Sequence, residues 1–256
     1  MNQIMAIVEK SLKEFLRDKV VLFFTFAMPI FFLLMFPIMW GGVQKEIVPE
    51  LKGGLSLTMI TFLIMVAGQS DLSGSIASDR ERGLYLKIAS MPIKPWTEGL
   101  GRTFGIWIFA LIGSTLLLLI GVIYGAKFDG RFITVLECTG FVLLIALAST
   151  GVGLIIASLI KGESAATHTG IAITLLTSFL GGMFLPYSML PSTLQSFARG
   201  YPISSANALM VSLLQGEELV GYNPLSSAQI SFTIALSFLL FIVGLVLYSK
   251  FCWRKR

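Results

Sequence analysis

Long apolar runs, one after another, limit the folds open to this chain more than any other feature. Six stretches are apolar over a length that can cross a bilayer: 20–40, 55–77, 104–125, 133–160, 165–185 and 230–248. A helix needs ~20 consecutive apolar residues to span the hydrocarbon core. Lipid offers the backbone no hydrogen-bond partner, so unbroken runs of this kind indicate helices. The sequence therefore predicts an all-α polytopic membrane protein with six transmembrane helices.

The overall composition agrees with a membrane protein and argues against a soluble one. Hydrophobic residues make up 55% of the 256 residues, charged residues only 13%, and the mean hydropathy is +0.84. A soluble domain of this length would need more polar surface. No internal repeat or low-complexity linker interrupts the pattern, so residues 1–256 are expected to form a single transmembrane domain.

The basic residues predict the orientation in the membrane. With the N-terminus in the cytoplasm, fourteen of the 19 Lys and Arg residues fall on the cytoplasmic side of the six predicted helices. Cytoplasmic loops carry such an excess in membrane proteins, so both termini are expected to be cytoplasmic. The net charge of +5 is concentrated at the ends of apolar runs. This placement is explained by topology, and no nucleic-acid partner is predicted.

Two segments outside the apolar runs have patterns of their own. Residues 1–19 contain an amphipathic stretch, with apolar residues on one helical face and charges on the other, which is typical of a helix lying in the membrane interface. Residues 186–229 are broken by prolines, and 204–216 between them predict a short helix with Ser204 as its N-cap and Gly216 past its end. Its apolar content suggests a re-entrant-like segment between the fifth and sixth spans.

The sequence offers little to an enzyme. His168 is the one histidine, so an HExxH zinc site is excluded, and there is no G-x-x-x-x-G-K-[ST] motif for a nucleotide. We therefore expect no catalytic residue, no metal and no cofactor bound by this chain. An intramembrane enzyme or a scaffold without transport activity stays open as the alternative from another functional class.

Few polar residues enter the predicted spans. Asp71 lies in the last two turns of the second, within reach of the cytoplasmic face, and Glu137 lies about one turn into the fourth. Either position is tolerable near a membrane surface without a function, because the cost of a charge falls toward the ends of a span. Glu137 is accordingly either an interfacial or paired residue, with Lys127 or Arg131 as partner, or a residue lining a substrate path.

Small residues recur every four positions along the predicted fifth span. Gly170, Thr174 and Ser178 belong to this stripe, and such spacing lets helix backbones approach closely. Packing within the chain is one explanation of the stripe. A dimer seam or a translocation path is the other.

Residues 78–96, SDRERGLYLKIASMPIKPW, form a charged segment between two apolar runs. A short helix is predicted from Asp79 to Lys87, followed by a turn with Pro92 and Pro95. Leu84 would belong to a small apolar face surrounded by charges. The segment is either a docking element on the cytoplasmic side or a solvated loop that obeys the positive-inside rule.

ERGLYLKIASMPIKP, residues 81–95, resembles the E-R-x-G-T-x-[DE]-x-L…P stretch of type-2 ATP-binding-cassette (ABC) exporter permeases. Leu84 stands where that family often has Thr. The amphipathic start running into FFTFAMPIFFLLMFP, residues 23–37, and the proline-rich outer segment FLPYSMLPSTLQSFARGYPISSANALM, residues 184–210, are also similar to the family. The order and spacing of these segments carry the resemblance over essentially the whole chain.

The resemblance implies a permease subunit of an ATP-driven exporter in the plasma (inner) membrane. Two copies of a separate P-loop ATPase would bind ATP and Mg²⁺, and a second permease subunit would complete a homodimer or heterodimer in the lipid. Arg80, Glu81, Arg82, Gly83 and Leu84 would contact the ATPase. The apolar spans favour a hydrophobic or amphipathic cargo, as in multidrug efflux. Export of a lipid-linked polysaccharide or an ion is the alternative within transport.

Overall fold

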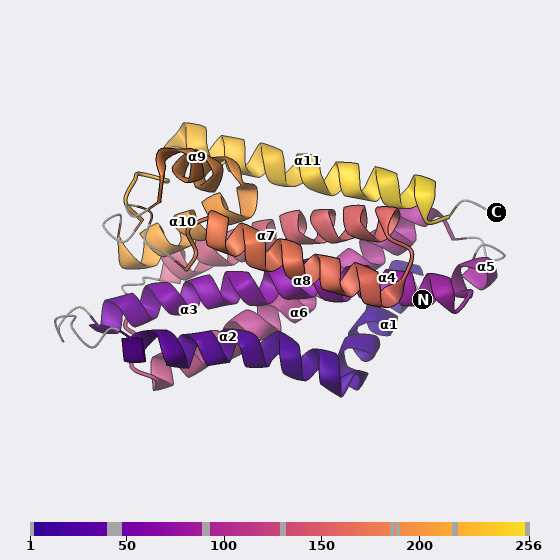
Figure 1. Ribbon diagram of the computed structural model, residues 1–256, viewed down its shortest axis with the longest axis horizontal. Coiled ribbons are helices and arrows are strands. Elements are labelled where there is room, and N and C mark those ends of the chain that lie inside the picture. Colours follow the sequence, from indigo (N-terminus) through magenta and orange to yellow (C-terminus); the bar gives the residue numbers. More distant parts are fainter. Residues whose placement is uncertain are drawn as a thin grey trace.

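The computed structural model of the chain describes residues 3–39, 48–88, 93–128, 132–184, 187, 190–216 and 220–253. Within these ranges every element is a helix, and the long ones lie side by side in one elongated bundle (Figure 1). The elements are α1 (Gln3–Arg17), α2 (Lys19–Met39), α3 (Val48–Met65), η1 (Val66–Asp71), α4 (Leu72–Glu81), α5 (Leu84–Ile88), α6 (Pro95–Ile123), α7 (Phe132–Leu159), α8 (Glu163–Leu180), α9 (Ser192–Gly200), α10 (Pro202–Gln215) and α11 (Ser227–Phe251).

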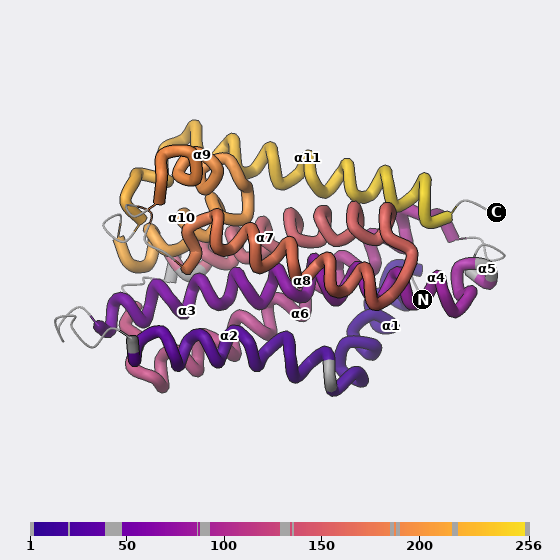
Figure 2. Tube along the Cα trace, viewed as in Figure 1, coloured from indigo at the N-terminus to yellow at the C-terminus, as the bar shows by residue number. Residues whose placement is uncertain are grey.

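The bundle has two distinct ends, which Figure 2 traces along the Cα path. One holds α1, α5 and the last turn of α11, and we call it the termini end. The other holds α9 and α10, and we call it the loop end. The all-α prediction is confirmed for the described residues.

Five helical stretches are long and apolar enough to cross a membrane. They are Val21–Ile38, Val48–Glu81, Pro95–Ile123, Leu136–Leu159 and Ser227–Phe251. The predicted fifth span, 165–185, corresponds to α8, which lies alongside the others but does not meet the same standard (Figure 1). Its first turns carry Glu163, Thr167 and His168, which lower its apolar character.

The second span is longer than the sequence predicts. Residues 55–77 were expected, but α3, η1 and α4 follow one another as a single rod from Val48 to Glu81. Most of this rod is buried by the other helices, whereas most residues of α2 and α11 are not buried. The rod is therefore the centre of the bundle, and α2 and α11 form its periphery.

A π-helix, η1, interrupts the rod at residues 66–71. Segments of this kind are rare and occur mostly as single turns inside α-helices, often at functional sites. Four of its six residues are buried, and α7 and α8 pack against it. Asp71 ends this π-helix, so it lies ten residues before the end of the rod and deeper in the span than the sequence predicts.

Glycines allow α7 to come very close to its neighbours. Gly153 lies against the backbone of Gly68 in η1, and Gly151 lies against Gly244 of α11. A side chain at Gly151 would place its Cβ 2.8 Å from the carbonyl oxygen of Leu240, too close for two such atoms. These contacts fix α7 between the central rod and the periphery.

The N-terminal helix α1 confirms the predicted amphipathic segment as a helix. It packs against α6, where Gly101 and Gly105 leave room for Ile7 and Ser11. The face buried there is Ile7, Ser11 and Phe15, whereas Leu16, expected on the apolar face, is 63% exposed. A position in the membrane interface stays a prediction.

The loop end contains two short helices where the sequence predicted one. The start of α10 differs from the prediction, because Tyr201 is its N-cap and Pro202 its first residue. Ser204 is inside the helix, and its hydroxyl donates to the carbonyl oxygen of Gly181. Gly216 does follow the helix end, with a φ of 87° that favours glycine. The α10 helix packs on α3, α7 and α11.

Candidate functional site

The charged segment predicted to dock a partner forms a sharp corner at the termini end. α4 ends at Glu81, and α5 begins at Leu84. Gly83 between them has a φ of 70°, and its amide donates to the carbonyl oxygen of Arg80 over 3.1 Å. A glycine is suited to this left-handed position at a helix end because it has no Cβ. We call residues 80–85 the corner.

Two of the predicted contact residues hold other helices in place. The Arg80 guanidinium donates to the carbonyl oxygen of Ala157 over 2.6 Å, at the last turns of α7. The Glu81 carboxylate accepts from the amide of Glu163 over 3.2 Å, at the first turn of α8. A cation at a helix C-terminus and an anion at a helix N-terminus are both favourable. The corner therefore caps α7 and α8.

The remaining predicted contact residues are more accessible. The Arg82 side chain is 76% exposed and lies 3.9 Å from the Glu163 carboxylate. No atom of the described residues lies within 4 Å of the place where a Cβ of Gly83 would be, and Leu84 is half-buried. Arg82, Gly83 and Leu84 are thus the part of the corner that another protein could reach.

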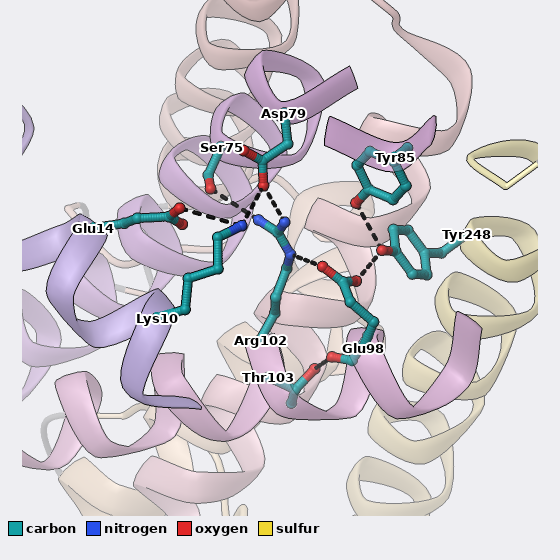
Figure 3. A network of polar contacts seen from close by, with 10 residues as sticks. Lys10, Glu14, Ser75, Asp79, Tyr85, Glu98, Arg102, Thr103 and Tyr248 are labelled. Atoms are coloured by element: carbon teal, nitrogen blue, oxygen red, sulfur yellow. Dashed lines mark hydrogen bonds and ion pairs between the residues drawn. The ribbon is translucent and has the colours of Figure 1, made fainter. Parts of the chain in front are cut away.

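A buried charged network lies directly behind the corner (Figure 3). Arg102 of α6 is 2% exposed and has three partners. Its Nε donates to Glu98 over 2.5 Å, and its Nη1 donates to the Ser75 hydroxyl over 2.9 Å. Its Nη2 forms an ion pair with Asp79 of α4. A buried guanidinium is stable only when its donors are satisfied in this way.

The network continues from Glu98 through two tyrosines to the corner itself. The Tyr248 hydroxyl of α11 donates to the second oxygen of Glu98. The hydroxyls of Tyr248 and Tyr85 lie 2.7 Å apart, and Tyr85 is the first residue after Leu84 (Figure 3). Burial raises the pKa of Tyr85 well above its usual value, and the Glu98 carboxylate raises it further, so this phenol stays protonated.

The other branch of the network reaches the N-terminal helix. Lys10 of α1 donates to Asp79 over 2.9 Å and lies 3.2 Å from Glu14. Asp79 is therefore shared between Lys10 and Arg102, two cations from different helices (Figure 3). Together the two branches join α1, α4, α5, α6 and α11.

Sequence reasoning did not find this network. Residues 95–103 were assigned to the loop before a span at 104–125, but α6 begins at Pro95. A signal was present, because Pro95 is a favourable first residue of a helix and Glu98 and Arg102 are four residues apart. The long-range partners Asp79 and Tyr248 left no local signal.

The stripe of small residues on α8 packs within the chain. Gly170 lies against the backbone of Gln69 and Ser70 in η1, where a side chain would collide. Thr174 donates to the Gln69 side chain over 3.2 Å, and the Ser178 hydroxyl lies 3.7 Å from the sulfur of Met65. Each of these contacts is with the central rod.

The isolated ionisable residues of the spans, Asp71, Glu137 and His168, differ in their partners and exposure. Thr25 donates to Asp71 over 2.8 Å, which pairs α2 with the central rod. Glu137 is exposed on α7, and no described residue forms an ion pair with it; Lys127 does not, and Arg131 lies outside the described residues. His168 is exposed on α8. Within the described ranges, His, Cys, Asp and Glu form no group that could hold a metal.

Comparison with known proteins places the whole arrangement in context. A family model described as "ABC-2 type transporter" matches residues 2–214, which include α1, the central rod, the corner and the α6 residues of the network. No curated protein matches the chain.

Proposed function

From the premise that this chain belongs to the ABC-2 type transporter family, we propose that it is the permease subunit of an ATP-driven exporter. Families of this kind supply the membrane domain and not the nucleotide-binding domain. Such permeases normally pair with an ATP-binding cassette ATPase, which binds ATP and Mg²⁺. The corner is the surface where we expect two copies of this ATPase to act on a pair of permease subunits.

One observation carries the proposal: the corner is connected to most of the bundle. Arg80 holds the end of α7, Glu81 holds the start of α8, and Tyr85 meets Tyr248 of α11. Asp79, one residue before the corner, is joined to α6 and α1. A force applied to the accessible side chains would therefore reach five helices at once. A solvated loop would need none of these contacts.

The proposed topology has six spans, with α8 as the one that composition does not identify. Its polar first turns lie beside the corner, and its apolar second half carries exposed Ile171, Leu176 and Phe179. With α8 included, the chain crosses an even number of times, and α1 and the end of α11 lie on the same side. The excess of basic residues on that side supports placing it in the cytoplasm, with the chain in the plasma membrane.

The proposed cargo is hydrophobic or amphipathic: a drug, an antibiotic or a lipid-like molecule. Charges are few in the spans outside the network, and the faces of α2, α6 and α11 are apolar. Alternating access would follow from two such subunits, homodimeric or heterodimeric, moving together when the ATPase closes on ATP. The α10 helix would enter the outer leaflet covered by α3, α7 and α11.

The test is to purify the tagged chain gently from its native membrane and identify co-purifying proteins by mass spectrometry. A P-loop ATPase at near-equal amount is expected. Leu84→Asp should remove it, because a carboxylate replaces the apolar group of the corner that a partner can reach. ATP-dependent flux of the cargo should be lost in the same variant.

The matched control is Ile123→Asp, the same kind of change at the loop end, where Ile123 is 86% exposed. It should retain the ATPase. An equal amount of ATPase with Leu84→Asp and with the wild-type chain would contradict the proposed contact. If the ATPase co-purifies with the chain but the transported molecule is a lipid-linked glycan, the proposed ATPase contact stands and the proposed cargo is wrong.

A further inference from the structure

A groove runs along the outside of the bundle, away from the corner and its network. Its volume is about 640 Å³, and α6, α7, α10 and α11 line it. The walls are aliphatic and aromatic, with Leu144, Leu147, Ile234 and Phe238 among them. Ile234 is 41% exposed and Phe238 51% exposed, so the groove is open on the side of α11 that would face lipid.

Of the described residues that line this groove, one is charged. Glu137 of α7 is exposed at its rim and has no ion-pair partner among the described residues. No basic residue is among the described residues that line the groove. A carboxylate beside an apolar wall is complementary to a molecule with a long apolar body and one cationic group.

The length of the groove suggests what that molecule is. Glu137 lies close to the start of α7, and Leu147 lies ten residues further along the same helix. At about 1.5 Å per residue the two are ~15 Å apart along the helix axis. The hydrocarbon core of a bilayer is ~30 Å thick, so this distance is about the depth of one leaflet.

We propose that the groove holds an amine-headed phospholipid of the outer leaflet, with its ammonium group at Glu137 and an acyl chain along Leu144, Leu147 and Phe238. Glu137 is at the loop end, which faces outward in the proposed topology, and the inference rests on that part of the proposed function. The site is separate from the corner. It would make the permease responsive to the lipid composition of the outer leaflet.

The test is native mass spectrometry of the full chain released from vesicles with equal amounts of phosphatidylethanolamine, phosphatidylcholine and phosphatidylglycerol that share the same acyl chains. The wild-type chain should retain phosphatidylethanolamine in preference to phosphatidylglycerol. Glu137→Gln should lower that preference by roughly two- to fivefold, the range expected for one ion pair at a partly solvated site. Glu50→Gln, another exposed carboxylate at the loop end, should leave it unchanged.

A second pair of variants tests the apolar part. Ile234→Trp fills the groove and should reduce retention of all three lipids, whereas Ile242→Trp, on the same helix but outside the groove, should not. The proposal is overturned if Glu137→Gln keeps the wild-type preference. It is also overturned if the chain retains no lipid and instead forms a dimer that Ile234→Trp breaks. Neither readout uses the ATPase or transport, so either result leaves the proposed permease function standing.

Discussion

The two ends of the bundle are held together by different chemistry. At the termini end, charged side chains from the three helices α1, α4 and α6 share partners around Arg102 and Asp79. At the loop end the hydrogen bonds between buried side chains are neutral: Asn207 accepts from Thr61 over 2.8 Å, and the Ser205 and Thr233 hydroxyls lie 2.7 Å apart. When one member of a charged network is displaced, the groups that share it as a partner lose interactions together. Separate neutral hydrogen bonds break independently of one another.

This difference indicates which end of the bundle can transmit a displacement from one helix to the others. A displaced Asp79 would disturb Arg102 and Lys10 together, and through Arg102 also Glu98. Among the described residues the Asn207 side chain has hydrogen bonds to Thr61 and Thr58, both on α3, so its displacement would break bonds to one helix. We therefore expect the termini end to move as a unit with the corner, and the loop end to adjust locally.

Breaking the network at its centre should have the largest effect. Arg102→Met removes the cation and leaves Glu98 and Asp79 without their main partner. Breaking a buried ion pair in this way costs about 3–5 kcal/mol. The thermal unfolding of the purified chain in detergent measures the loss, and an unchanged unfolding temperature would contradict the network as drawn in Figure 3.

A double substitution checks whether the cost comes from unpaired charge. Glu98→Gln added to Arg102→Met removes one of the stranded carboxylates. It should recover part of the lost stability. A further loss instead would mean that Glu98 has a favourable role that does not depend on Arg102.

The two tyrosines should differ in their contribution. Tyr248 donates to a carboxylate, whereas the hydrogen-bond partner of the Tyr85 hydroxyl among the described residues is the Tyr248 hydroxyl. A bond to a charged group contributes about 1.5–3 kcal/mol, and a neutral one about 0.5–1.5 kcal/mol. Tyr248→Phe should therefore destabilise the chain more than Tyr85→Phe in the same unfolding measurement. The reverse order would show that the chain of bonds does not run through Tyr248.

The neutral bonds of the loop end should matter less. Asn207→Ala removes bonds to Thr61 and Thr58. Interhelical hydrogen bonds in membrane proteins average about 0.6 kcal/mol and reach ~1.7 kcal/mol. A loss as large as that of Arg102→Met would remove the distinction between the two ends.

The smallest effect is expected from a charge on the accessible side of the corner, which also serves as the control for Arg102. Arg82→Met makes the same change at a side chain that is 76% exposed and 3.9 Å from Glu163. Exposed ion pairs contribute roughly 0–1 kcal/mol. The unfolding temperature should hardly change. Any defect of this variant should appear only in binding of the ATPase.

Apolar runs were sufficient to predict the helices and their approximate bounds. The predicted 133–160 and 20–40 match α7 and α2 within one or two residues, because the hydrophobic pattern along these helices ends where they end. The pattern failed where polar residues continue a helix. Residues 95–103, which include Glu98 and Arg102, were assigned to a loop, yet they are the start of α6. Residues 79–81 were predicted as the start of a short helix and instead form the last turn of the rod.

The candidate site could be predicted only in its local part. ERGLYLKIASMPIKP pointed to this segment, because a charged stretch between two apolar runs is visible in one window of sequence. The predicted single helix from Asp79 to Lys87 was wrong, because the chain turns at Gly83 between α4 and α5. The partners behind it are far apart in the chain. Tyr248 is 163 residues from Tyr85 and 150 residues from Glu98, and no periodicity reports such a contact.

The π-helix in the central rod determines how the residues after it are rotated about the axis of the rod. Successive residues of an α-helix are rotated by about 100°, and a π-turn holds one residue more than an α-turn. Removing a single residue from 66–71 would restore a plain α-helix and turn α4 by roughly that angle relative to α3. Asp79 would then point away from Arg102, and the corner would face another side of the bundle. The six residues of η1 thus rotate α4 relative to α3, so that the charged end of the rod faces its partners.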